Sequence, residues 1–89
     1  PKLSRYSLGN KIDDSFLEFI ESAYFTLYSS KTNRRIALRK TSRKLDILKL
    51  FLRIAWETNL LDSKKYAAIS IPLAAIGKII GGWQKQLLS

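Results

Sequence analysis

The chain has 89 residues, which suits one small domain, and nearly half of them are hydrophobic, which argues against disorder. It contains neither cysteine nor histidine, which excludes a disulfide framework, a zinc site of the usual ligands, a cysteine nucleophile and a histidine base. Its net charge of +9 indicates a polyanionic partner, most often a nucleic acid, or an acidic protein surface.

The first predicted helix runs from about residue 8 to residue 28, with Ser7 as a suitable N-cap. Apolar residues mark one face: Leu8, Ile12, Phe16, Phe19, Ile20, Ala23 and Leu27. The other side carries acids that could in principle bind a metal: Asp13, Asp14, Glu18 and Glu21. A one-sided acidic spread is typical of a solvated face, and no base, nucleophile or Gly-rich phosphate loop accompanies it. We therefore expect no catalytic site, no metal and no other cofactor.

The second predicted helix, about residues 34–58, has two unlike halves, and Thr32 or Asn33 can cap it. Its first half is basic, with no acid between Lys31 and Leu45. Its second half is apolar nearly all round, apart from a narrow polar stripe of Asp46, Lys49, Arg53 and Glu57. A helix that is apolar on most sides must be covered on most sides. Two helices of the same chain would not suffice, so we expect a further helix, another subunit or both.

The third predicted helix, about residues 63–87, carries a heptad seam of bulky residues: Tyr66, Ile69, Leu73, Ile76, Ile80, Trp83 and Leu87. Small residues form a stripe beside it: Ala67, Ser70, Ala74, Gly77 and Gly81. Each interior glycine costs about 1 kcal/mol relative to alanine, so this helix should have neighbours on more than one side. Pro72 predicts a bend and not a break, because the heptad phase continues across it.

Short connections between long helices predict an all-α fold, an antiparallel up-down bundle in one domain over residues 1–89. No secretory leader is visible, and the uncharged run from Tyr66 to Gly77 is too short to span a bilayer. A membrane-active helix is disfavoured because only Lys78 and Lys85 decorate the later half of the last helix. We therefore expect a cytoplasmic protein with no membrane partner.

The basic half of the second helix is the main candidate binding site. Because no acids interrupt it, it predicts a ridge that binds phosphates by charge and releases counterions, without reading sequence. The candidate residues are Arg34, Arg35, Arg39, Lys40, Arg43, Lys44, Lys49 and Arg53. Lys49 and Arg53 either snorkel to water from an exposed stripe or line a groove that meets an anion. The alternative for the whole set is a solvated face whose charge only confers solubility.

A second set of residues is assigned to helix packing or to an oligomer interface: Phe51, Trp56, Ala74, Gly77, Gly81 and Trp83. For the two glycines, close packing within one subunit is favoured over a subunit interface, since G-x-x-x-G spacing is weak evidence outside a membrane. The aromatic residues are expected mainly in the core, Trp83 among them. Base stacking on these rings is the alternative.

Several segments resemble the accessory variability determinant (Avd) proteins of diversity-generating retroelements. They are Arg5–Ile12, Lys44–Asp46, Leu48–Glu57, Leu61–Tyr66 and Ile76–Trp83, and the Ile-Gly-x-x-x-Gly-x-Trp ending is the most specific of them. The resemblance covers essentially the whole chain. Members of the family usually have another helix before the first of these segments, which implies that part of the bundle is uncovered here. Pro72 also departs from the family, where an ordinary helix former is expected.

The resemblance implies a four-helix bundle, here without its first helix, that assembles into a basic, barrel-like homopentamer. It implies a non-catalytic subunit that binds the retroelement's reverse transcriptase and RNA or DNA and supports mutagenic cDNA synthesis. Carried over to this chain, it makes Arg39, Arg43, Lys49 and Arg53 the best candidates for polymerase or RNA contact. A related group, encoded in intervening sequences of 23S ribosomal RNA genes, shares the bundle and has an RNA-linked but unknown role. That group and a purely structural oligomerisation module stay open as alternatives.

Overall fold

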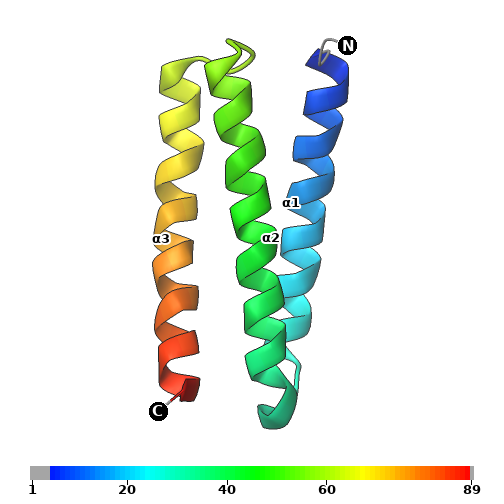
Figure 1. Ribbon diagram of the computed structural model, residues 1–89, viewed down its shortest axis with the longest axis vertical. Helices are drawn as coiled ribbons and strands as arrows, with labels where there is room; N and C mark the ends of the chain where they lie inside the picture. The colour runs from blue at the N-terminus through cyan, green and yellow to red at the C-terminus, as the bar shows by residue number, and fades with distance from the viewer. Residues whose placement is uncertain (1–4, 89) are drawn as a thin grey trace.

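Three long helices follow one another in alternating directions in the computed structural model, which describes residues 5–88 (Figure 1). They are α1 (Arg5–Leu27), α2 (Lys31–Glu57) and α3 (Ser63–Leu88). No strand occurs in this range, so the predicted all-α class is confirmed. Two of the three helix starts differ from the prediction.

The starts of α1 and α2 lie earlier than predicted. Because α1 begins at Arg5, Ser7 lies inside it and is not its N-cap. Ser30, and not Thr32 or Asn33, caps α2: its backbone is extended, and its hydroxyl accepts a hydrogen bond from the Asn33 N–H at 3.3 Å. An N-cap oxygen satisfies one of the free N–H groups of the first turn, which sets where the helix begins.

The turn between α2 and α3 is a Schellman motif. Asn59 has a φ of 64°, the left-handed region that asparagine tolerates better than most residues. The Leu60 N–H donates to the Ala55 carbonyl at 2.8 Å, and the Asn59 N–H to the Trp56 carbonyl at 3.1 Å. Asp62 Oδ1 then accepts a hydrogen bond from the Lys65 N–H at 2.8 Å and caps α3. The chain reverses here within a few residues, which places α3 alongside α2.

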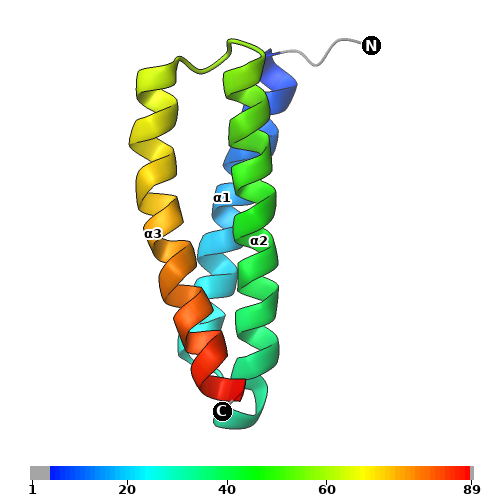
Figure 2. The same ribbon diagram turned by 60° about the vertical axis from the view of Figure 1, so that its left-hand side comes forward.

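α2 is the central helix and packs against both α1 and α3. Across the described residues, no Cα atom of α1 lies within 8 Å of one in α3, and Figure 1 shows the two on either side of α2. Figure 2 shows α3 running the length of α2 with α1 behind them. α2 therefore contributes most of the core. The buried hydrophobic cluster of the core consists of Phe19, Leu38, Leu45, Leu48, Leu52, Leu73 and Ile80.

A buried chain of hydroxyl groups fixes how α1 sits against α2. Thr41 Oγ1 lies 2.7 Å from Ser22 Oγ and 2.9 Å from Thr26 Oγ1, and Thr26 donates to the Ser22 carbonyl at 2.9 Å. One proton order satisfies all three contacts: Ser22 donates to Thr41, and Thr41 donates to Thr26. Each of these three hydroxyl groups thus has a hydrogen-bond partner, so burying them costs little free energy.

α3 passes through Pro72 without a break, as predicted. By length and composition alone, Ser63–Leu87 could cross a bilayer, with a mean hydropathy of 1.3. The expectation that this region is too short was therefore wrong, because the apolar helix continues well beyond Lys78. Core helices of soluble proteins meet the same requirement, but only 11% of the most apolar window of α3 is buried by this chain. Most of this apolar window is therefore not covered by α1 or α2.

Two flanking helices do not cover α2. Ile47 and Leu50 lie on its outer side and are 45% and 54% exposed. The predicted shortage of covering helices is thus confirmed within the described chain. It extends to the other two helices, where Leu17, Ile20, Ile71 and Ile79 are all more than half exposed.

Leu48 is fully buried on α2 and tests the central place of this helix. We expect Leu48→Ala to lower the free energy of unfolding by about 3 kcal/mol, because a cavity opens between three helices. Leu50→Ala removes the same atoms from an exposed site and should change the free energy of unfolding by about 0.5 kcal/mol or less. Urea denaturation monitored by circular dichroism measures both. Equal losses for the two variants would contradict the packing described here.

Candidate nucleic-acid interface

One end of the molecule is strongly basic. The first half of α2 starts there, at the end where α1 and α3 finish (the lower end in Figure 1). It carries seven cations and no acid: Lys31, Arg34, Arg35, Arg39, Lys40, Arg43 and Lys44. The opposite end mixes both signs of charge, with Asp13, Asp14, Glu57 and Asp62 among its residues. The excess positive charge of the protein is therefore concentrated at one end.

Two of these cations stand where a helix disfavours them. The N-terminus of a helix carries partial positive charge, and each cation near it costs about 0.3–1 kcal/mol when exposed. The first turn of α2 has no acid, yet it contains Lys31 and Arg34. The helix dipole therefore does not account for the cations of this first turn.

One cation of the set is neutralised within the chain. Lys44 Nζ lies 2.8 Å from Glu18 Oε1, which joins α2 to α1. The hydrogen bond from Lys44, and then its charge, lowers the pKa of Glu18 below the usual value. Because the folded-state pKa is lowered, the pair stabilises the fold above the ordinary carboxyl pKa. That contribution is lost as the pH falls through the lowered pKa. Both groups face water, so the effect on stability is small.

A second cation is engaged with the backbone. Arg34 is half-buried and donates from Nη2 to the Ser29 carbonyl at 3.1 Å, which ties α2 to the preceding turn. Four more cations of the first half of α2 are exposed and have no ion pair within residues 5–88: Arg35, Arg39, Lys40 and Arg43.

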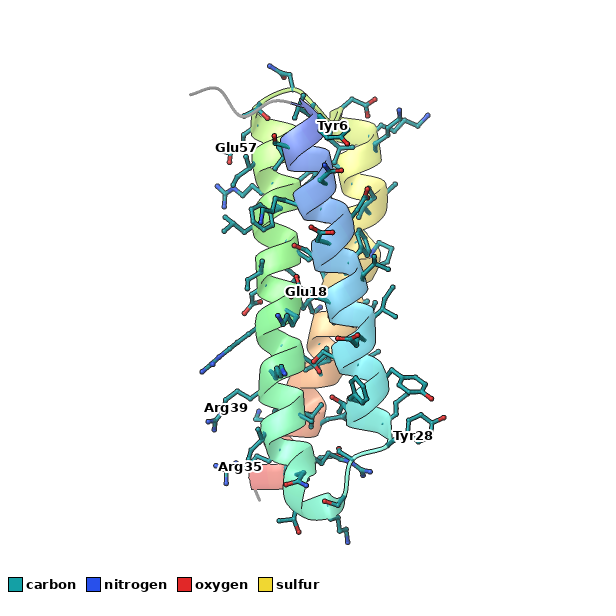
Figure 3. All side chains as sticks on the ribbon, turned by 90° about the vertical axis from the view of Figure 1, so that its right-hand side faces the viewer. Tyr6, Glu18, Tyr28, Arg35, Arg39 and Glu57 are labelled. Carbon is teal, nitrogen blue, oxygen red and sulfur yellow. The ribbon has the colours of Figure 1, made fainter. Side chains whose placement is uncertain are left out.

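The exposed cations form a convex ridge around the outer side of α2. Figure 3 shows Arg35 and Arg39 projecting from the lower part of α2, on the side away from Tyr28. By helical periodicity Arg43 faces outward, and Lys40 lies toward α1, where it lines a hollow with Tyr28. A convex set of unpaired guanidinium and ammonium groups suits a phosphate backbone or an acidic protein surface. No three acidic side chains that could hold a metal ion converge in the described part of the chain.

The comparison with known families gives the context for this ridge. The profile of the bAvd-like family matches residues 1–87. The chain belongs to the bAvd-like family. This confirms the resemblance to Avd proteins, a family that is in general accessory and non-catalytic. No curated protein and no solved structure matches the chain significantly.

In this bAvd-like chain, six of the eight predicted binding residues lie together at the basic end, and Lys49 and Arg53 do not. Arg53 lies further along α2 and pairs with Glu57 at 3.5 Å. Lys49 is half-buried between α2 and α3, with its ammonium beside Gly77. The eight predicted binding residues therefore form two groups, which Asp46 separates along α2. The six that lie together occupy the first half of α2 in this bAvd-like protein.

The two glycines predicted to pack closely have different surroundings. A Cβ atom on Gly77 would lie 3.3 Å from Lys49 Nζ and 3.5 Å from Leu45 Cδ2, so this glycine lets α3 approach α2 closely. A Cβ atom on Gly81 would meet nothing within 4 Å. Packing within the subunit therefore accounts for Gly77 alone. Gly81 and the exposed Ala74 lie on open surface, where another chain could approach closely.

The predicted interface aromatics also divide. Trp56 stacks on Tyr66, with ring centroids 4.8 Å apart, and its Nε1 donates to Ser63 Oγ at 3.0 Å. Phe51 is half-buried on α2. Trp83 was expected in the core but is 45% exposed. Trp83 stays exposed because α1 and α3 do not pack against each other within the described residues.

The space between α1 and α3 is an apolar groove. Phe19 and Leu27 line it from α1, and Ile79 and Trp83 from α3, around a hollow of about 270 Å³. Further hollows lie at both ends of the same groove: one against Leu87, with Arg34 in its lining, and an apolar one against Leu8. The groove offers apolar surface along much of the length of the two helices.

The structure also places aromatic rings outside the core that the sequence placed inside it. Tyr24, Phe25 and Tyr28 are 58%, 63% and 74% exposed at the basic end of the molecule. Tyr24 and Tyr28 continue a stripe with Leu17, which is also more than half exposed. Their distance around the helix from the seam of Leu8 and Phe19 was the available signal that they face outward.

Proposed function

We propose that this bAvd-like chain is the non-catalytic accessory subunit of a diversity-generating retroelement. In this proposal its basic end binds the reverse transcriptase and RNA or cDNA and supports mutagenic cDNA synthesis. The observation that carries the proposal is the ridge of exposed cations on α2. Arg35, Arg39, Lys40 and Arg43 are exposed and have no ion pair within the described residues. Membership of the bAvd-like family supports the choice of partner.

The proposed mechanism needs several copies of the chain. One chain presents few phosphate contacts, whereas a ring of copies presents the same ridge repeatedly and gains affinity through multivalency. The resemblance to Avd proteins favours a homopentamer. Apolar surface on α1 and α3 supports assembly, because exposed patches of this extent mark interaction sites in soluble proteins.

We further propose that protein and not lipid covers α3, and that the protein works in the cytoplasm. The seam side of α3 already packs on α2 through Leu73 and Ile80. Lys78 and Lys85 lie in its later half, and a charge within a bilayer costs several kcal/mol, on the order of 3. A second protein chain covers apolar surface and leaves these lysines in water.

The test of the proposed function is binding at two salt concentrations. Fluorescence anisotropy with a labelled RNA, and co-purification with the retroelement's reverse transcriptase, measure the two partners. Four phosphate contacts in each chain predict that log K falls with log salt with a slope of about −3. Affinity that does not change with salt, or absence of both partners from the bound fraction, would overturn the proposal. Binding of RNA without the reverse transcriptase would favour the group encoded in ribosomal RNA genes.

A further inference from the structure

A cluster of exposed aromatic rings lies at the end of α1. The rings of Tyr24 and Tyr28 have centroids 4.8 Å apart, and Phe25 meets Tyr24 edge-on at 6.0 Å. All three are more than half exposed. Single exposed rings are normal on protein surfaces, whereas a contiguous group of them marks an interaction site. Figure 3 shows Tyr28 projecting into solvent at the end of α1 opposite Tyr6. The cluster contributes little to the core and presents ring faces and edges to whatever binds there.

This aromatic cluster borders a hollow of about 670 Å³ between α1 and α2. Phe25 and Tyr28 line it on one side, and Ile36 and Lys40 from α2 line it on the other. A space of this size lies within the range of ligand sites, roughly 300–1,000 Å³. The hollow therefore joins an apolar, aromatic wall to the basic ridge.

The charges around the hollow are unequal. Lys44 is neutralised by Glu18, whereas Lys40 is exposed and has no ion pair within residues 5–88. Glu21 also lines the hollow and disfavours an anion on its side. A phosphate is therefore favoured along the α2 wall, beside Lys40 and the outward-facing Arg43. The aromatic wall is left for an uncharged part of the ligand.

We infer that this hollow binds the unpaired bases of a single-stranded nucleic acid, which rests on the nucleic-acid binding proposed above. Bases stack on Phe25 and Tyr28, while the phosphates follow Lys40 and the ridge. A duplex hides the faces of its bases and gains only the phosphate contacts. The strand is held without sequence preference, because every base has a π-face.

The test compares a single strand with a duplex of the same length and sequence. Phe25→Ala combined with Tyr28→Ala should weaken single-strand binding by about tenfold or more and leave duplex binding and its salt slope unchanged. Tyr6→Ala is the matched control, because Tyr6 is equally exposed at the far end of the same helix. Tyr28→Leu keeps apolar volume but removes the ring, so it separates stacking from simple burial. Circular dichroism establishes that each variant keeps its helices.

A second readout locates the bases directly. A single strand carrying 5-iodouracil should cross-link on irradiation to Tyr24, Phe25 or Tyr28, as mapped by mass spectrometry, and not to Tyr6. If both nucleic acids bind and the alanine variant weakens neither, this inference is wrong and the proposed function stands. If the wild-type chain binds neither, both are wrong. Reduced polymerase binding with unchanged strand binding would identify the cluster as a protein interface and overturn the inference.

Discussion

Arg39→Glu combined with Arg43→Glu is expected to abolish binding to RNA and to the reverse transcriptase. Both side chains are exposed and lack an ion pair within the described chain, so each is free to contact a phosphate or a carboxylate. Losing a charge-assisted contact costs about 1.5–3 kcal/mol, and two losses with added repulsion give a drop on the order of 1,000-fold. Because neither side chain packs on the core, helix content should stay unchanged.

The control for this variant is Lys64→Glu combined with Lys65→Glu. These lysines are exposed at the start of α3, at the opposite end of the molecule, and the substitution changes the net charge equally. If binding depends on the ridge, the control retains most of its affinity. An equal loss in both variants would show that only the overall charge matters. Unchanged binding in the Arg39 and Arg43 variant would refute the ridge itself.

The purified chain is expected to form a homo-oligomer, with a mass near five times the 10.2 kDa of one chain. Ile79→Glu combined with Trp83→Glu should dissociate it, because both residues line the apolar groove between α1 and α3. Burying an unpaired carboxylate in such an interface costs several kcal/mol in each subunit, on the order of 3–5. Both side chains are about half exposed in one chain, so the single fold should survive. Light scattering coupled to size-exclusion chromatography measures the mass.

Gly82→Glu is the matched control for the groove. It adds one negative charge to the same helix, as Trp83→Glu alone does, but on the side away from Ile80, where a Cβ atom would meet nothing within 4 Å. We expect it to leave the oligomer intact and to favour the helix slightly, since glycine is a poor helix former. A wild-type chain that stays monomeric in dilute solution would overturn the assembly. Flotation of that monomer with phosphatidylcholine vesicles would show that lipid covers α3 instead.

Sequence periodicity identified the three helices and most of the core. The heptad seam of α3 faces α2 through Leu73 and Ile80, as its spacing predicts. Helix starts were less accurate, because a cap depends on which hydroxyl reaches a free N–H group. At α2, Ser30 takes that place although Thr32 and Asn33 are equally suitable by residue type.

Local pattern could not show which apolar residues stay exposed. Trp83 follows the helical spacing typical of a core, yet it borders an open groove and is 45% exposed. Spacing defines a face of a helix, but the number of neighbours decides whether that face is covered. Here α2 has two neighbours, and these do not close on each other.

The same distinction holds for the candidate site. The sequence alone determined that the chain is basic, has no cysteine or histidine chemistry, and carries seven cations and no acid from Lys31 to Lys44. Only the tertiary structure decided which of them stay unpaired, because Glu18 lies far from Lys44 in sequence and reaches it through the packing of α1 on α2. It also brought Phe25 and Tyr28 beside Lys40. Contacts between residues distant in the chain depend on how the helices pack, and no local pattern encodes that.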